Sequence, residues 1–231
     1  MHPDFKRLAS MRKFMMRGDP RQAPNFGRDH AAQWISRQGI ALPKGIKIKP
    51  TGFGRIITPR APATHKMMIY IHGGGLVYYD TAVFTPFLAQ LSQQIGIKIA
   101  AVDYPKAPET PAQDILASIK KNVLAILRDN PNCEITLAGD SVGGLLAMRI
   151  AQSLRKGQFK DLHLIYPVTD PEIDPECRFG TGHFLDSQMM DWFYTFIDPL
   201  FDVETPIAQL PQTTVHIAET DILAHQGQAF A

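Results

Sequence analysis

Short apolar runs alternate along this chain with longer segments in which apolar residues recur every three or four positions. Runs that are apolar at successive positions suit strands buried on both faces of a parallel sheet. They are KMMIYI (66–71), IKIAAV (97–102), EITLA (134–138), DLHLIY (161–166) and TTVHIA (213–218). The segments with helical spacing lie between them, at 83–95, at 112–130 and after Ser141. Strands that alternate with helices predict an α/β fold, with a mainly parallel sheet covered on both sides.

The first part of the chain has a different pattern. Two short helices are predicted at 3–17 and 28–38, on either side of the breaker-rich stretch GDPRQAPNFG. After them, GIKIKP (45–50) and FGRIIT (53–58) predict two strands joined by a turn. This part therefore reads as an accessory segment rather than as a continuation of the strand–helix alternation.

The length of 231 residues fits one α/β domain with a modest extension. RAPAT (60–64) marks a boundary between the two patterns. We therefore expect an N-terminal segment at 1–65, with cap helices and the first strand pair, and an α/β core at 66–231.

The formal net charge of +2 conceals an asymmetry. Residues 1–66 hold 14 Lys and Arg against 3 Asp and Glu, whereas residues 67–231 hold 10 against 19. A basic segment can bind nucleic acid or an anionic membrane. Here the basic residues are interleaved with prolines and apolar residues, and no nucleic-acid motif accompanies them. We interpret the segment as a solvated basic surface and expect no nucleic-acid partner.

The composition indicates neither a membrane protein nor a metalloprotein. No apolar run approaches the length of a bilayer span, and the N-terminus lacks an apolar signal core. We expect a cytoplasmic protein without stable membrane insertion. Cys133 and Cys177 lie in no metal-ligand spacing, and the sequence has no H-E-x-x-H motif, so no metal site is predicted.

The segment GDSVGG (139–144) carries the first chemical pattern. A serine between glycines follows a buried-type strand and opens a helix, which is the setting of a nucleophile elbow. The helix N-terminus behind it offers unpaired N–H groups and a favourable dipole to a developing oxyanion. The alternative is a helix start whose glycines only permit close packing. Ser141 is thus a candidate nucleophile, and it would need a base to take its proton.

A second glycine-rich motif, HGGG (72–75), directly follows the strand KMMIYI. Three glycines let backbone N–H groups approach a ligand oxygen, as an oxyanion hole requires. The alternatives are a flexible turn and a phosphate-binding loop, although neither a Walker pattern nor G-x-G-x-x-G follows. We interpret His72 as a structural residue whose ring hydrogen-bonds the loop, and not as a base.

These motifs, taken in order, resemble the hormone-sensitive-lipase-like branch of the α/β-hydrolase family, which are esterases with a Ser–His–Asp triad. HGGG is followed by DYPKAPE (103–109), similar to the family's D-Y-x-x-A-P-E, and then by GDSVGG in place of the common G-D-S-A-G-G. YPVTD (166–170) resembles the family's Y-P block, and AETDIL (218–223) resembles the segment with the triad acid. The resemblance covers residues 66–225. It implies an α/β-hydrolase three-layer sandwich with an N-terminal helical cap segment.

Carried over residue by residue, the resemblance implies that Ser141 is the nucleophile and Asp221 the triad acid. The oxyanion hole would be formed by the backbone N–H of Val142 together with those of the HGGG glycines. These glycines are Gly73, Gly74 and Gly75, of which Gly74 is the safest member. Three further acidic residues match family positions and are interpreted as structural: Asp103, Glu109 and Asp140. Departures from the family pattern are Pro105 and Lys106, and the short stretch between Ser141 and Asp221.

The family's base is a histidine on a loop after one more strand, well beyond the acid. Only ten residues follow Asp221 here, so the resemblance implies a shortened C-terminus, and no histidine matches the base. His225 and His183 are the nearest alternatives. The other histidines precede the core or lie inside strands: His2, His30, His65, His163 and His216. We also expect the strand at 213–218 to form an exposed sheet edge, which could pair with another chain as a homo-oligomer.

The resulting hypothesis is a serine hydrolase that cleaves carboxylic esters of short or medium acyl chains through an acyl-enzyme on Ser141. The cap and LVYY (76–79) would supply the apolar wall of its pocket. A small-molecule ester is the expected partner, and no cofactor is implied. Because no base is matched, we expect feeble or no turnover from these 231 residues. The alternatives are a non-catalytic ligand-binding protein of this fold and a truncated product.

Overall fold

The structure is a computed structural model that describes residues 28–29, 41–172, 185, 187–201, 210–219 and 221–231. The helix expected at 3–17 lies outside these residues, as does His183. Of the helix expected at 28–38, only Arg28 and Asp29 are described, and both are helical. The division of the chain at residue 65 stays a prediction.

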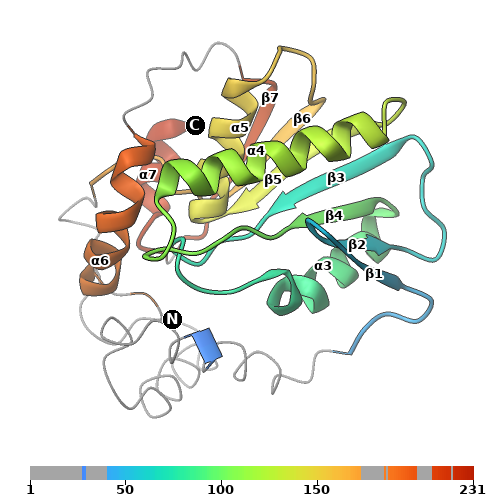
Figure 1. Cartoon of the computed structure of the whole chain (residues 1–231), viewed down its shortest axis with the longest axis horizontal. Coiled ribbons are helices and arrows are strands. Elements are labelled where there is room, and N and C mark those ends of the chain that lie inside the picture. Colours follow the sequence, from blue (N-terminus) through green and yellow to red (C-terminus); the bar gives the residue numbers. More distant parts are fainter. Residues whose placement is uncertain (1–27, 30–40, 173–184, 186, 202–209, 220) are drawn as a thin grey trace.

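Among the described residues, one seven-stranded sheet has the order β1-β2-β4-β3-β5-β6-β7 (Figure 1). Its strands are β1 (Lys47–Thr51), β2 (Gly54–Thr58), β3 (Lys66–Ile71), β4 (Lys98–Val102), β5 (Glu134–Asp140), β6 (Asp161–Ile165) and β7 (Gln212–His216). Strands β4, β3, β5, β6 and β7 pair in parallel, whereas β2 is antiparallel to both β1 and β4. The expected mainly parallel sheet, preceded by a strand pair, is confirmed.

Helices cover both faces of this sheet (Figure 1). The helices among the described residues are α3 (Thr81–Ile95), α4 (Ala112–Asp129), α5 (Val142–Ser153), α6 (Ser187–Ile197), the 3₁₀ turn η2 (Asp198–Leu200) and α7 (Ala224–Phe230). Helices α4 and α5 share one buried cluster with β3, β5 and β6. Helix α3 packs on the other face, where Leu88 and Ala89 join a second cluster with Tyr70 and Ile99. The result is the expected three-layer α/β sandwich.

Local hydrogen bonds determine where α3 begins and ends. Asp80 caps its N-terminus, because the carboxylate accepts hydrogen bonds from the N–H groups of Ala82 and Val83 at 2.8 and 3.1 Å. Gly96 ends the helix with φ 67°, and its N–H donates to Ser92 O at 2.9 Å. The sequence places Gly96 just beyond a helix end, and the structure agrees.

Helix α5 is the most enclosed helix near the site, since every residue from Val142 to Gln152 is buried. Its first turn lies against the end of β3 without room for a side chain. A Cβ on Gly143 would collide with the carbonyl oxygen of Ile71 and lie 2.6 Å from that of His72. Glycine at this position therefore sets how closely α5 approaches β3, and with it where Ser141 lies relative to the HGGG loop.

Strand β7 is the last strand of the sheet among the described residues. Its side chains alternate between exposed and partly buried, with Gln212, Thr214 and His216 exposed. The expectation of an exposed edge at 213–218 is confirmed for the described part of the chain.

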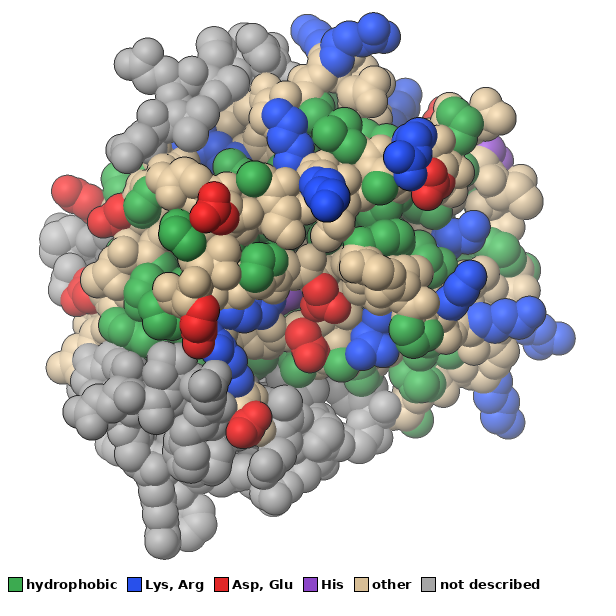
Figure 2. Space-filling view, viewed as in Figure 1, with side chains coloured by type: hydrophobic (Ala, Val, Ile, Leu, Met, Phe, Trp, Pro, Cys, Tyr) green, Lys and Arg blue, Asp and Glu red, His purple; other side chains and the backbone are tan. Residues whose placement is uncertain are grey.

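The surface view shows acidic and basic side chains interspersed with hydrophobic ones across the described part of one face (Figure 2). Among the described residues, no helix combines the length and apolar character that crossing a membrane requires.

We predict that Gly143→Ala lowers the free energy of unfolding by about 1–3 kcal/mol, since an added methyl must push backbone apart. Gly52→Ala is the matched control, because a Cβ at Gly52 would meet nothing within 4 Å. Urea unfolding of both variants measures the difference. A Gly143→Ala variant as stable as the Gly52→Ala variant would show that α5 is not held against β3 in this way.

Candidate active site

Ser141 occupies a sharp turn between β5 and α5. Its backbone has φ 54° and ψ −125°, a conformation that a residue with a side chain adopts only under strain. The turn is held by three hydrogen bonds: the Ser141 N–H donates to Ile165 O at 2.9 Å, and the Ser141 carbonyl accepts from the N–H groups of Gly144 and Val168 at 3.0 and 3.1 Å. The side chain makes no capping hydrogen bond and is partly exposed. The predicted strand–turn–helix setting of Ser141 is confirmed.

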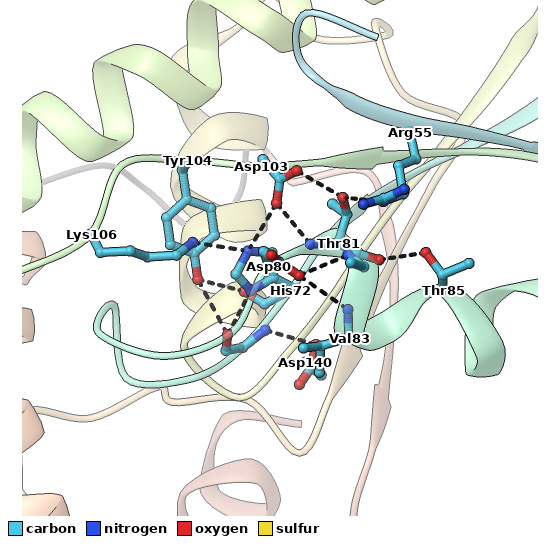
Figure 3. Close-up of polar contacts among 12 residues, drawn as sticks. Arg55, His72, Asp80, Thr81, Val83, Thr85, Asp103, Tyr104, Lys106 and Asp140 are labelled. Carbon is cyan, nitrogen blue, oxygen red and sulfur yellow. Dashed lines mark hydrogen bonds and ion pairs between the residues drawn. The ribbon is translucent and has the colours of Figure 1, made fainter. Parts of the chain in front are cut away.

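The buried Asp140 carboxylate joins this turn to the HGGG loop (Figure 3). Its Oδ1 accepts from the Gly73 N–H at 2.9 Å and from the Tyr70 hydroxyl at 2.7 Å. Burial raises the pKa of Asp140 to about 6, against the effect of both hydrogen bonds, which favour the ionised form. Asp140 thus has the structural role expected from the sequence, and it fixes the loop at the turn that holds Ser141.

The contact with Asp140 removes one N–H group from the predicted donors of the oxyanion hole. Because the Gly73 N–H donates to the Asp140 carboxylate, it is already engaged in this structure. A Cβ on Gly73 would lie 2.5 Å from Asp140 Oδ2 and 3.1 Å from the Ser141 Cβ. Gly73 therefore allows the HGGG loop to lie close to the turn at Ser141, and its N–H is not a donor for a substrate oxygen.

The other predicted donors have no acceptor among the described residues. The N–H groups of Gly74 and Gly75 appear in none of the described hydrogen bonds, although Gly75 is buried. Val142 is the first residue of α5, so its N–H has no acceptor within the helix. Gly74 has φ 112°, and its carbonyl accepts from the N–H groups of Val77 and Tyr78 at 3.0 and 2.8 Å. This turn leaves the N–H groups of Gly74, Gly75 and Val142 as candidate oxyanion donors.

His72 is enclosed behind this loop with an exposed fraction of 1% (Figure 3). Its Nδ1 lies 2.7 Å from Gly73 O and its Nε2 lies 3.1 Å from the Lys106 ammonium. Its ring stacks on Tyr104, with centroids 4.3 Å apart. Burial, together with the Lys106 charge, holds the pKa of His72 well below its usual value. The interpretation of His72 as a structural residue that hydrogen-bonds the loop is confirmed.

Asp221 follows β7 on the same edge of the sheet as Ser141. Strands β5, β6 and β7 are adjacent and parallel, and both residues come after carboxyl ends, Ser141 directly and Asp221 after a short loop. Asp221 Oδ1 accepts from the Leu223 N–H at 3.0 Å. Burial raises the pKa of Asp221, against the effect of backbone N–H groups. Asp221 thus comes after the carboxyl end of β7, and its role as triad acid stays a prediction.

Tyr166 is a residue of this edge that the sequence analysis treated only as part of a motif. It directly follows β6 with φ 35°, and its N–H donates to His216 O at 2.7 Å. Burial raises the pKa of Tyr166, and the negative charges of Asp140 and Asp221 raise it further. Tyr166 therefore lies near the carboxylates from β5 and from the loop after β7. A match to the Y-P block was the signal available in the sequence.

The sequence model of the family described as the alpha/beta hydrolase fold matches residues 68–231. The chain belongs to the α/β-hydrolase fold family.

Named relatives support a branch of this family that includes hormone-sensitive lipase. The chain is 30% identical over 190 residues to the ethyl acetate hydrolase of Pseudomonas putida. The matched segment covers 71% of this chain and 58% of that protein. It is 30% identical over 123 residues to the hormone-sensitive lipase of Mus musculus, covering 48% of this chain and 16% of that protein. The chain spans just over half the length of the curated relatives that it matches over most of its own length.

Solved esterases share the fold of this α/β hydrolase. The hyperthermophilic esterase from the archaeon Pyrobaculum calidifontis superposes with a TM-score of 0.86, over 100% of this chain and 84% of that one. The two sequences are 21% identical, so this likeness shows the fold alone.

The described histidines of this α/β hydrolase do not identify a base. His163 and His216 lie on β6 and β7 with Nδ1 and Nε2 3.0 Å apart, so they contact each other. His65 is exposed before β3, and His225 is exposed on α7. His72 is engaged with Gly73 and Lys106. Within the described residues, the hydrolase core thus presents a candidate nucleophile and acid without an assigned base.

Aromatic side chains from α6 pack beside the glycine loop. The ring of Tyr78 lies edge-on to Phe193 at 5.7 Å and near Trp192 at 6.1 Å. A Cβ on Gly75 would collide with the Phe193 ring. A wall formed by LVYY (76–79) was expected from the sequence, whereas α6 was not predicted.

The described part of the core contains no group of three or more His, Cys, Asp or Glu side chains that could hold a metal ion.

We predict that Asp140→Asn changes how stability depends on pH. The pKa of Asp140 is raised from 3.8 to about 6 by folding, so the folded state favours the protonated form. Its contribution is fully present below pH 4 and is lost as the pH rises through about 6. Between these values the parent chain should lose up to about 3 kcal/mol relative to Asp140→Asn, at 1.36 kcal/mol per pKa unit.

Urea unfolding at several pH values measures this difference. Asparagine keeps an oxygen that can accept from Gly73 and Tyr70, so the fold should be retained. Asp129→Asn, on the exposed end of α4, is the control. Parallel stability–pH curves for Asp140→Asn and the parent chain would refute the predicted shift.

Proposed function

We propose that this α/β hydrolase cleaves small carboxylic esters with Ser141 as its nucleophile. The observation that carries the proposal is the strained turn at Ser141, which places a partly exposed hydroxyl beside a loop with unengaged N–H groups. A strained conformation of this kind persists only where the surrounding structure imposes it, and it is concentrated at functional sites. Helix packing alone would not require the positive φ of Ser141.

In the proposed reaction, Ser141 Oγ attacks the ester carbonyl carbon and gives up its proton to a base. The carbonyl oxygen becomes an oxyanion that accepts hydrogen bonds from the N–H groups of Gly74, Gly75 and Val142. The tetrahedral intermediate collapses, the C–O bond to the alcohol breaks, and the alcohol leaves with a proton. Water then attacks the acyl-enzyme and releases the carboxylic acid and Ser141.

Asp221 is proposed to orient the base. Its carboxylate lies on the correct edge of the sheet and is partly buried, which suits a residue that holds an imidazole in one tautomer. The aspartate does not take the proton itself in such an arrangement. Since no described histidine is assigned as the base, we expect the 231-residue chain to be a slow catalyst.

A small acyl or alcohol group is proposed to bind beside Gly75. Tyr78, Trp192 and Phe193 form an apolar surface next to Gly75, so an alkyl group bound there would lose contact with water. The relative from Pseudomonas putida is named for the hydrolysis of ethyl acetate, a small ester. Both observations support short or medium acyl chains.

The parent chain should hydrolyse p-nitrophenyl acetate and butyrate slowly and in a manner that depends on Ser141. An enzyme without its full triad retains about 10³–10⁴-fold catalysis over water from the oxyanion hole and binding. We therefore expect turnover well below about 10 per second, a typical enzyme rate. Initial rates measured by p-nitrophenolate absorbance compare the parent chain with Ser141→Ala.

Ser153→Ala is the matched control, because Ser153 lies on the last turn of the same helix and its hydroxyl donates to the nearby backbone oxygen of Ile150 at 3.0 Å. Loss of turnover in Ser141→Ala but not in Ser153→Ala supports the nucleophile. Equal rates in Ser141→Ala and the parent chain would contradict it and favour a ligand-binding role. Turnover at ordinary esterase rates would instead contradict the expected lack of a base.

A further inference from the structure

Lys106 fills one of the two unspecified positions in the D-Y-x-x-A-P-E motif, and its side chain reaches behind the glycine loop. Figure 3 shows it extending past Tyr104 toward His72. Its ammonium lies 3.6 Å from the centre of the Tyr104 ring and 3.1 Å from His72 Nε2. Removing a lysine ammonium from water costs free energy unless other polar groups replace the lost hydration. The contact with His72 therefore calls for a physical explanation.

The contact determines which nitrogen of His72 carries the proton. An ammonium group has three donors and no acceptor, so His72 Nε2 must accept from Lys106. The ring proton is then on Nδ1, which donates to Gly73 O at 2.7 Å. Lys106 thereby selects the tautomer that can hold the Gly73 carbonyl. With the proton on Nε2 instead, two acceptors would face each other across that 2.7 Å.

Fixing the Gly73 carbonyl also fixes the next N–H group. The Gly73 carbonyl and the Gly74 N–H belong to one planar peptide unit, so they turn together. Glycines on both sides leave this unit few side-chain constraints of its own. It is held instead by His72 and by the Tyr104 hydroxyl, which donates to His72 O at 2.8 Å and approaches Gly73 O at 3.3 Å.

We propose that Lys106 is a positioning residue for the oxyanion hole. Through the His72 tautomer it sets the plane of the Gly73–Gly74 peptide and so directs the Gly74 N–H toward the substrate oxygen. The inference rests on the proposed function for its catalytic consequence, whereas the link from Lys106 to the peptide plane stands on the contacts alone. Asp140 holds the same loop from the other side through the Gly73 N–H.

The charge on Lys106 is sensitive to pH in an accessible range. Burial lowers the pKa of Lys106 to about 8, although the negative charges of Asp103 and Asp80 raise it; the positive charge of Arg28 makes a smaller contribution in the same direction as burial. These groups come from the N-terminal segment, the end of β4 and the cap of α3, and His72 faces Lys106 from the end of β3. The uncharged amine can accept a hydrogen bond from a protonated His72 Nε2, so Lys106 no longer imposes the Nδ1–H tautomer above this pH.

The test is NMR of the full chain with ¹⁵N-labelled histidine, from pH 6 to 9.5. His72 should be the Nδ1–H tautomer at pH 7, and its Nε2 resonance should move with a midpoint near 8 although the ring itself stays neutral. The Gly74 amide resonance should move with the same midpoint. The resonances of His72 are assigned by their loss in His72→Gln.

Lys106→Met keeps an apolar stem over Tyr104 and removes the ammonium, so it should abolish both titrations. Lys121→Met, an exposed lysine on α4, is the control and should keep them. Lys106→Arg retains the charge and should retain the Nδ1–H tautomer. Unfolding of Lys106→Met, seen as loss of spectral dispersion, is separated from the proposed effect because the pH titration of the parent chain moves the same resonances in folded protein.

Kinetics give the second readout. Loss of one oxyanion donor costs about 10²–10³-fold in kcat, so a misdirected Gly74 N–H should lower Ser141-dependent kcat about 10- to 100-fold in Lys106→Met, with little change in KM. Lys106→Arg should recover part of this loss. A His72 found as the Nε2–H tautomer at pH 7, or a Gly74 resonance and kcat unchanged by Lys106→Met, overturns the inference. If Ser141→Ala already equals the parent chain, the proposed function fails, while the NMR result still decides the role of Lys106.

Discussion

Three backbone segments approach one another closely around Ser141, and this contact determines the geometry of the candidate site. The end of β3, the end of β5 and the first turn of α5 meet at distances that leave no space for a Cβ at Gly73 or Gly143. Ser141 takes a strained conformation between them, and Asp140 ties β5 to the loop after β3. Because backbone rather than side chains forms this junction, its N–H groups are brought to the one hydroxyl that the turn presents.

Buried polar groups stabilise the junction from two sides. Asp140 accepts from Gly73 and Tyr70 on one side, and His72 accepts from Lys106 and donates to Gly73 on the other. Such groups are costly to bury unless each is hydrogen-bonded, so together they permit one arrangement of the loop and penalise others. The same groups carry shifted pKa values, with Asp140 raised to about 6 and Lys106 lowered to about 8. The loop geometry should therefore be most uniform between these two values.

Local patterns in the sequence predicted most of the fold and the main site positions. The strand and helix order, the turn at Ser141 and the place of Asp221 follow from apolar periodicity and from motifs that are short and contiguous. Local patterns could not predict contacts between residues that are far apart in the chain. The engagement of Gly73 by Asp140 needs the register of β3 against β5. The role of Lys106 was missed because the motif leaves its position unspecified, and the contact with His72 is visible only in the fold. Helix α6 was missed because its aromatic residues become part of the site only through their contact with Gly75.

We propose that Ser141 and the N–H groups of Gly74 and Val142 form one reacting centre. The most direct measurement is a crystal structure of the chain after reaction with diethyl p-nitrophenyl phosphate, a reagent that leaves a tetrahedral phosphoryl group on a reactive serine. We expect phosphorus bonded to Ser141 Oγ, with one phosphoryl oxygen within about 3.1 Å of the N–H groups of Gly74 and Val142. Phosphorylation at another residue, or a phosphoryl oxygen directed away from both N–H groups, would contradict it.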